Sequence, residues 1–303
     1  MSANGGMRIG IWGCRGSLPT PGASTVRYGG NTSCVEVSLD DGSLLVLDAG
    51  TGIRCLGDEL AERGVREIQL LLTHLHLDHL EGLRFFAPMW NPEVSIHIWG
   101  PPSPTSSLRD RIARSFSPPL FPLELNDVPS KVTFHDVPRE PWTLGPFSLS
   151  ASLVVHPGPT VGYRIRAGGA TFAYIPDHEP ALCGRLAELP PDWISGGAVA
   201  KGADLLLHDA QYFEDEYQAR IGWGHSSVAD AVAYARAVDA QRLLLFHHEP
   251  LHADASLDRL EDRARELAGQ NGRGPTLARE GMVVELQPRL VLEEHRERRG
   301  EAV

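Results

Sequence analysis

Short apolar stretches, each bounded by Gly, Pro, Asn or Asp, recur along most of the chain. They are rich in Val, Ile and Leu, which is typical of β-strands joined by tight turns. The expected strands are residues 7–13, 33–39, 43–50, 67–74, 95–100, 131–137, 147–156, 161–168, 170–177, 242–248 and 281–286. The strands between residues 95 and 177 mostly follow one another directly, so we expect antiparallel pairing among them.

Helical spacing of apolar residues occurs in residues 56–64, 226–238 and 256–269. We expect Ser226 or Ser227 to cap the second helix, and Ser256 to cap the third, which should end near Gly269. Because the strands come in two blocks, each followed by helices, the pattern predicts two β-sheets packed together with helices on the outside.

Two stretches depart from this pattern. Residues 100–130 are dense in Pro and Ser around one short basic amphipathic piece, which indicates an inserted loop or lid, or else an inert connector. Residues 289–303 form a charge-rich tail that we expect to be solvated. No repeat or composition shift marks a linker, so residues 1–303 are expected to form a single domain.

Composition narrows the range of functions. The chain has 303 residues, and its 28 Lys and Arg against 39 Asp and Glu give a formal charge of −11. This balance disfavours nonspecific binding to a nucleic-acid backbone. The four cysteines are far apart, and the N-terminus lacks the basic and apolar regions of a signal peptide, which favours a reducing, cytoplasmic location. No apolar run approaches the roughly 20 residues of a membrane span.

The densest chemistry lies in residues 73–82, THLHLDHLEG, directly after the apolar run 68–72. Four ligand-type side chains occur there, namely His74, His76, Asp78 and His79. Imidazole and carboxylate groups are the usual ligands of zinc and related transition-metal ions. The alternating Leu75 and Leu77 would anchor the loop beneath these ligands. The pattern predicts a metal site whose remaining ligands lie elsewhere.

Further ligands are expected where apolar strands end, because loops at strand ends hold functional groups while the strands fix their geometry. Ionisable residues of the metal or acid–base type occur at five such strand-end or helix-start positions: His156, Asp177, Asp209, His225 and His247. Each one alone is more often a satisfied core or capping residue. Their combination favours a metal centre.

These segments resemble the metallo-β-lactamase-fold hydrolases. THLHLDH matches their H-x-H-x-D-H motif, and VVHPGPTVGYRI, YIPDHEP, LLLHDAQYF, WGHSS and LLLFHHEP resemble, in the same order, the branch that contains tRNase Z and the bacterial cyclic phosphodiesterases. The match runs from about residue 7 to residue 286. The resemblance implies an α/β fold, an αββα sandwich of two mixed sheets flanked by helices, with two metals at one edge of the sheets.

The resemblance also implies a role for each residue. One metal would be held by His74, His76 and His156, and the other by Asp78, His79 and His247, with Asp177 as the bridge. We expect two divalent ions about 3.5–4 Å apart, zinc first and manganese or iron as alternatives, that share a hydroxide as the nucleophile.

Three residues are expected to be catalytic, namely Asp78, Asp209 and His225. Asp209 would orient His225 and favour its charged form, so that His225 can protonate the leaving oxygen. The alternative for His225 is a structural neighbour of the following helix cap.

Several other residues have competing interpretations. His97 and His135 lie within strands, where packing explains them. His178, His208 and His248 should point away from the ligands if the backbone is extended, although the FHHEP segment leaves His248 as a competitor of His247.

Asp48 would support the ligand loop from behind, or only form a strand-to-helix turn. Residues 28–33 would offer backbone amides to a substrate, or only lead into a strand.

The expected size of the substrate depends on a segment that this chain lacks. The tRNase Z enzymes carry a long arm between the third histidine and the bridging aspartate, whereas here only a hairpin fits between His156 and Asp177. We therefore expect a small, possibly cyclic, phosphodiester substrate and no stable nucleic-acid or membrane partner. The relatives suggest a homodimer.

Two alternative functions remain, namely a lactone or ester hydrolase and a metal-bound sensor or carrier. Intact acid–base residues argue against the carrier.

Overall fold

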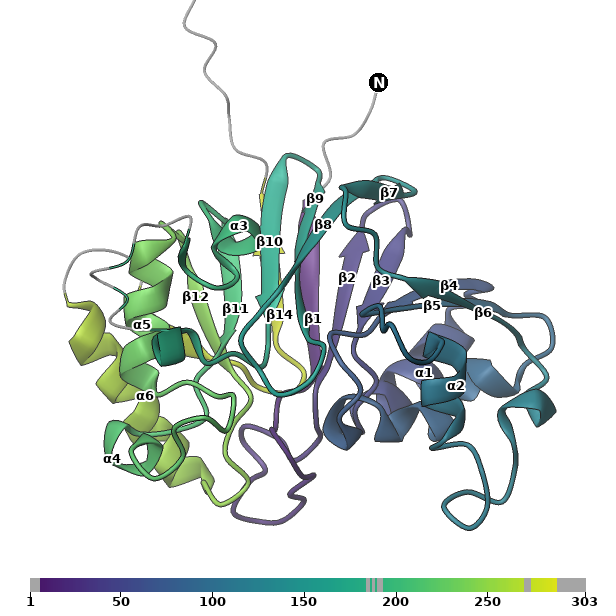
Figure 1. Ribbon diagram of the computed structural model, residues 1–303, viewed down its shortest axis with the longest axis horizontal. Coiled ribbons are helices and arrows are strands. Elements are labelled where there is room, and N and C mark those ends of the chain that lie inside the picture. Colours follow the sequence, from purple (N-terminus) through teal and green to yellow (C-terminus); the bar gives the residue numbers. More distant parts are fainter. Residues whose placement is uncertain (1–5, 184–185, 187–188, 190–192, 270–273, 288–303) are drawn as a thin grey trace, which may run out of the picture.

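Two mixed β-sheets face each other and carry helices on their outer faces (Figure 1). The computed structural model describes residues 6–183, 186, 189, 193–269 and 274–287. Within these residues each sheet has seven strands. The expected αββα sandwich is confirmed. The charged tail, residues 289–303, lies outside the described residues.

The strands are β1 Met7–Gly13, β2 Cys34–Leu39, β3 Leu44–Leu47, β4 Glu67–Leu71, β5 Ser95–Gly100, β6 Lys131–Asp136, β7 Trp142–Leu144, β8 Phe147–Leu153, β9 Val161–Ala167, β10 Ala170–Ile175, β11 Leu205–Asp209, β12 Leu243–Phe246, β13 Thr276–Leu277 and β14 Val283–Leu286. The α-helices are α1 Ile53–Glu62, α2 Leu108–Ala113, α3 Gly197–Ala200, α4 Glu214–Tyr217, α5 Val228–Ala237 and α6 Asp254–Ala268. Short 3₁₀ helices are η1 Leu77–His79, η2 Glu81–Phe85, η3 Ala87–Trp90, η4 Leu125–Asp127 and η5 Pro180–Cys183.

The first sheet has the order β14-β1-β2-β3-β4-β5-β6. Strands β14, β1, β2 and β3 pair antiparallel, whereas β3, β4, β5 and β6 pair parallel. The expected antiparallel pairing of residues 95–100 with 131–137 is therefore wrong. Parallel neighbouring strands need a crossover connection. The segment that contains α2 provides it, because it leads the chain from the end of β5 back to the edge of the sheet where β6 begins.

The second sheet has the order β13-β12-β11-β10-β9-β8-β7. Strands β7 to β10 form an antiparallel meander, and β10 to β13 are parallel. The hairpin of β9 and β10 closes through Gly168 and Gly169, whose φ angles of +56° and +74° suit the tight turn that matches strand twist. This turn lies at the top of Figure 1.

Three apolar layers hold the sandwich together. Between the sheets, fully buried side chains such as Ile9 and Val35 belong to the same cluster as Phe172 and Tyr174. A second layer lies under α5 and α6, and a third under α1 and α2. Burial of one such side chain contributes about 1.5–3 kcal/mol, so the two sheets are firmly joined.

The insertion at residues 100–130 is an anchored crossover. Ser107 caps α2 by accepting a hydrogen bond from the backbone N–H of Asp110. Leu108, Ile112 and Phe116 are buried in the layer beneath the helix, while Leu120 at the tip is 69% exposed.

The helix caps are only partly as expected. Ser227 caps α5, as one of the two predicted alternatives. The prediction of Ser256 as a cap is wrong, because α6 begins earlier, at Asp254. The Asp254 carboxylate accepts backbone N–H groups of Arg27 and Tyr28, and the Asp254 amide donates to Ser24. These contacts with the loop between β1 and β2 fix the start of the helix.

Candidate metal centre

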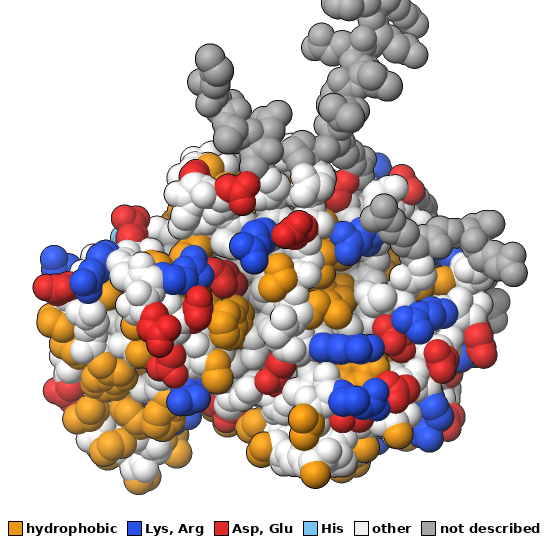
Figure 2. All heavy atoms as spheres, turned by 180° about the vertical axis from the view of Figure 1, so that it is seen from behind, with side chains coloured by type: hydrophobic (Ala, Val, Ile, Leu, Met, Phe, Trp, Pro, Cys, Tyr) orange, Lys and Arg blue, Asp and Glu red, His pale blue; other side chains and the backbone are white. Residues whose placement is uncertain are grey.

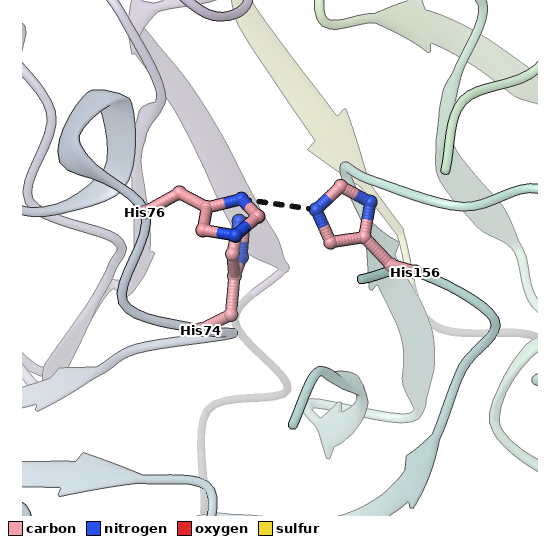
Figure 3. A group of neighbouring side chains, drawn as sticks. All are labelled: His74, His76 and His156. Carbon is pink, nitrogen blue, oxygen red and sulfur yellow. Dashed lines mark hydrogen bonds between the residues drawn. The ribbon is translucent and has the colours of Figure 1, made fainter. Parts of the chain in front are cut away.

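A first group of three imidazoles lies at the edge of the sandwich where β4 and β8 end (Figure 3). His74 and His76 come from the loop after β4, and His156 follows β8. Their ligand atoms lie within 4.8 Å of one another, and Nδ1 of His76 is 3.1 Å from Nε2 of His156. The rings converge on one point, as the figure shows.

A second group lies beside the first and is buried throughout. It consists of Asp78, His79, Asp177 and His247. Nε2 of His247 lies 3.1 Å from Oδ2 of Asp78 and 3.2 Å from Oδ2 of Asp177. The same Asp177 oxygen is 3.7 Å from Nε2 of both His74 and His156, so this carboxylate stands between the two groups. The structure thus brings together all seven residues expected as ligands.

Asp48 orients the second group from behind. Its buried carboxylate accepts hydrogen bonds from the amide of Thr73 at 2.7 Å, from the hydroxyl of Tyr174 at 2.9 Å and from Nδ1 of His79 at 2.9 Å. The Nε2 atom of His79 is thereby left to face Asp177, which is 3.0 Å away. The prediction that Asp48 supports the ligand loop is confirmed.

Two more histidines are oriented in the same way. Nδ1 of His156 donates to the carbonyl of Gly224 at 2.8 Å, and Nδ1 of His247 lies 3.1 Å from Oε1 of Gln211. Each bond fixes the tautomer in which Nε2 carries the free lone pair. Both Nε2 atoms lie within 3.7 Å of Asp177 Oδ2.

The residues fit a metal pair on their own chemistry. Nε2 of His74 and Oδ1 of Asp177 are buried without a hydrogen-bond partner, although Oδ1 lies close to His79. Such orphaned atoms are rare in folded proteins unless an ion or water satisfies them. Burial, together with the neighbouring His79, lowers the pKa of His74 well below its usual value, so the ring stays neutral and able to ligate.

The expected acid–base pair, Asp209 and His225, lies next to the second group. Nδ1 of His225 donates to Oδ2 of the fully buried Asp209 at 2.7 Å, and its ring stacks on His247 with centroids 4.7 Å apart. Burial alone would lower the pKa of His225, but the Asp209 carboxylate outweighs it and raises the pKa to about 9. The amides of Gln211 and Ser226 donate to the other oxygen of Asp209, which holds the carboxylate in place.

Comparison with known proteins agrees with this geometry. The Beta-lactamase superfamily domain matches residues 44–248. The chain belongs to this superfamily. It is 28% identical to the Ribonuclease Z of Haloarcula marismortui over 294 residues, with 86% of this chain and 91% of that protein covered.

Solved structures show the same fold. The metallo-β-lactamase-fold protein YhfI from Bacillus subtilis has a TM-score of 0.67 at 20% identity and covers 93% of this chain and 100% of its own. A diphosphatase from the PhnP family has a TM-score of 0.64 at 17% identity, with 93% and 98% covered. This superfamily member is a metal-dependent hydrolase, and its relatives include Ribonuclease Z enzymes.

The loop after β1 contributes to this superfamily site in a way that sequence reasoning missed. The backbone N–H of Ser17 donates to Oδ2 of Asp78 at 2.7 Å, in a strained conformation with φ of +59°. A Cβ on Gly16 would lie 2.3 Å from Nδ1 of His247. The segment CRGS contains no His, Asp or Glu, so its only signal is Gly16, three residues after the end of β1.

The other histidines are turned away from the ligands. His178 and His208 lie 2.9 Å apart through their ring nitrogens, beside Tyr234. His248 donates through Nε2 to a backbone carbonyl, that of Ala278. Of the two adjacent candidates, His247 is therefore the one in the cluster.

His97 and His135 pair across β5 and β6, outside the ligand groups. This contact agrees with the packing role expected for them.

Two expectations near the site are wrong. Leu77 does not anchor the ligand loop, because its side chain is 64% exposed. Within residues 28–33, the amides of Tyr28, Gly29, Asn31 and Thr32 donate to protein groups and are not offered to a substrate. This segment is a braced connection into β2, which is the other interpretation given for it.

Among the described residues, no helix is long and apolar enough to span a membrane.

Proposed function

We propose that this protein is a dinuclear metal-dependent phosphodiesterase that hydrolyses a small, possibly cyclic, nucleotide or a related phosphodiester. The observation that carries the proposal is the placement of Asp177 between two groups of ligand atoms, with the Asp209–His225 pair beside them. The Ribonuclease Z relative and the neighbouring diphosphatase support hydrolysis at phosphorus.

In this proposal each ligand group holds one divalent ion, zinc first and manganese or iron as alternatives. His74, His76 and His156 would hold one ion, Asp78, His79 and His247 the other, and Asp177 both. Bound ions would supply Lewis acidity toward the phosphoryl oxygens and would lower the pKa of a bound water.

The chain's own residues supply the proton that the leaving oxygen needs. Asp209 fixes Nδ1 of His225, so the proton that can be given away sits on Nε2. The raised pKa of His225 keeps that proton in place near neutral pH. His225 would then protonate the leaving oxygen as a general acid. Asp78, held by the amide of Ser17, keeps its carboxylate facing His247 within the second ligand group.

Charge and shape support a small substrate. Residues 157–176 are the β9–β10 hairpin and its flanks, without an added arm. With a formal charge of −11, the chain is poorly suited to hold an RNA backbone. On the face seen in Figure 2, Lys and Arg side chains are interspersed with Asp and Glu, without a continuous basic patch.

The proposal includes three further points. A homodimer is suggested by the family resemblance. Neither a stable nucleic-acid partner nor a membrane partner is expected. A cytoplasmic location is supported by the free thiols of Cys14, Cys34 and Cys55.

The test is a substrate screen on zinc- or manganese-loaded protein. The panel contains 3′,5′-cyclic and 2′,3′-cyclic nucleotides, bis-p-nitrophenyl phosphate, a pre-tRNA, a lactone and a carboxylic ester. We expect turnover of the small phosphodiesters. Turnover of the lactone or ester alone would favour the alternative ester hydrolase, and turnover of pre-tRNA alone would contradict the small-substrate proposal.

Two variants separate metal binding from proton transfer. Asp177→Ala should lose bound metal and turnover together. Asp209→Asn should keep its metal while kcat falls by about 10²–10⁴-fold, the usual contribution of a positioned acid. His97→Asn, which removes a histidine outside the ligand groups, is the control. Unchanged metal content in Asp177→Ala would refute the ligand assignment.

A further inference from the structure

A pocket of about 420 Å³ opens directly beside the candidate metal centre. Three of its lining residues also contact that centre: His225 pairs with Asp209, the side chain of Gln211 lies against His247, and the amide of Ser17 holds Asp78. The volume lies in the range of small-molecule sites. A group bound there would lie next to the proton donor, on the side of the leaving oxygen.

Trp223 presents a large apolar surface at this pocket. Its side chain is 60% exposed, although a Trp side chain is usually covered. Pro250 and Leu251, which is 83% exposed, line the same pocket. The pocket therefore offers exposed indole surface together with aliphatic surface.

The loop that carries Trp223 is held rigidly. The amides of Gly222 and Gly224 both donate to the carboxylate of Glu179 at 2.7 Å, and this carboxylate is fully buried. Both glycines have positive φ angles, of +87° and +93°. The carbonyl of Gly224 also accepts Nδ1 of His156, so the loop is tied to the first ligand group. An exposed indole on a fixed loop is preorganised for a ligand.

The rest of the pocket is polar and favours an occupant with hydrogen-bonding groups. Glu249 is 9% exposed, and its Oε2 accepts a hydrogen bond from Nε2 of Gln211 at 2.8 Å. This carboxylate favours an occupant that presents N–H or O–H donors to it. Arg220, whose guanidinium lies 4.9 Å from the centroid of the Tyr212 ring, adds donors to the lining.

From these features we propose that the pocket binds the nucleoside part of the substrate, with the base stacked on Trp223 and the sugar or base donors facing Glu249. This inference rests on the proposed phosphodiesterase function and names its substrate class as a nucleotide ester. The leaving oxygen of such a substrate is a sugar oxygen, so the nucleoside necessarily lies beside His225.

The kinetic test compares a 3′,5′-cyclic purine nucleotide with the matching abasic cyclic phosphate, methyl riboside 3′,5′-cyclic phosphate. In Trp223→Ala, kcat/KM for the nucleotide should fall by about 5- to 150-fold, the usual effect of removing one stacking contact. Turnover of the abasic compound should not change. Trp223→Phe should retain most of the activity. Trp193→Ala, which removes a tryptophan 79% exposed and outside the pocket lining, is the matched control.

A binding test needs no turnover and no metal. Saturation-transfer NMR with adenosine should show transfer to the adenine H2 and H8 protons in the wild type and in Trp193→Ala, and none in Trp223→Ala. Equal kcat/KM and equal transfer in Trp223→Ala would overturn the subsite and leave the phosphodiesterase function standing. Loss of transfer only in Trp223→Ala, in a protein without phosphodiester turnover, would support the subsite and refute the function.

Discussion

Gly16 leaves the space that the imidazole of His247 occupies. Its φ angle is not in the left-handed region, so the backbone would accept alanine, and the steric conflict with Nδ1 at 2.3 Å is the main consequence of an added Cβ. We expect Gly16→Ala to displace His247 and to weaken binding of one metal ion by about 10–100-fold, the range seen when the groups that position a ligand are changed.

Metal titration followed by elemental analysis, together with kcat for a phosphodiester, measures this effect. Gly22→Ala in the same loop is the control, because its Cβ would meet only Thr25 Oγ1, at 4.0 Å. Gly16→Ala protein that binds metal like the wild type would refute the steric argument.

The roles of some residues at the site could be predicted from the sequence, and those of others could not. Ligand positions could be predicted because His156, Asp177 and His247 each follow an apolar strand, and because their segments resemble a known family. Gly16 and Gln211 could not be predicted, since each acts through contact with His247, more than 30 positions away in the chain.

At the scale of elements, the segment around α2 is part of the core on one side and solvent-exposed on the other. Ile112 is fully buried, so Ile112→Ala should lower the free energy of unfolding by about 2–5 kcal/mol. Leu120→Ala, at the 69% exposed tip, should change it by no more than about 0.5 kcal/mol. Urea denaturation of both variants measures the difference. Equal, small effects would indicate that α2 is a loosely attached lid.

The element pattern in the sequence predicted the strands better than their pairing. Apolar stretches located nearly every long strand, but proximity in sequence suggested antiparallel pairing for β5 and β6. The Pro- and Ser-rich segment between them hid a crossover whose helix α2 has only six residues. The short strands β7 and β13 have three and two residues and carry no periodic signal.

At the scale of the whole molecule, the candidate ligands come from both sheets. The 74–79 loop extends the first sheet, whereas His156, Asp177 and His247 extend the second. Metal bound there would link the two halves of the sandwich and bind only the folded chain. Zinc at 100 times its dissociation constant should stabilise the protein by about 2.7 kcal/mol per site.

Thermal unfolding at increasing free zinc tests this linkage. The midpoint temperature should rise with zinc in the wild type and rise much less in Asp177→Ala. A midpoint independent of zinc in the wild type, after prior removal of metal by a chelator, would contradict it.

The turn at Gly168–Gly169 offers a practical attachment point. Strands β9 and β10 run from the catalytic edge to this turn, and seven residues of β9 at about 3.3 Å each place it roughly 23 Å from that edge. A fluorescent label or a short affinity peptide inserted there would lie remote from the chemistry. Such a probe would report on the protein without obstructing entry of its substrate.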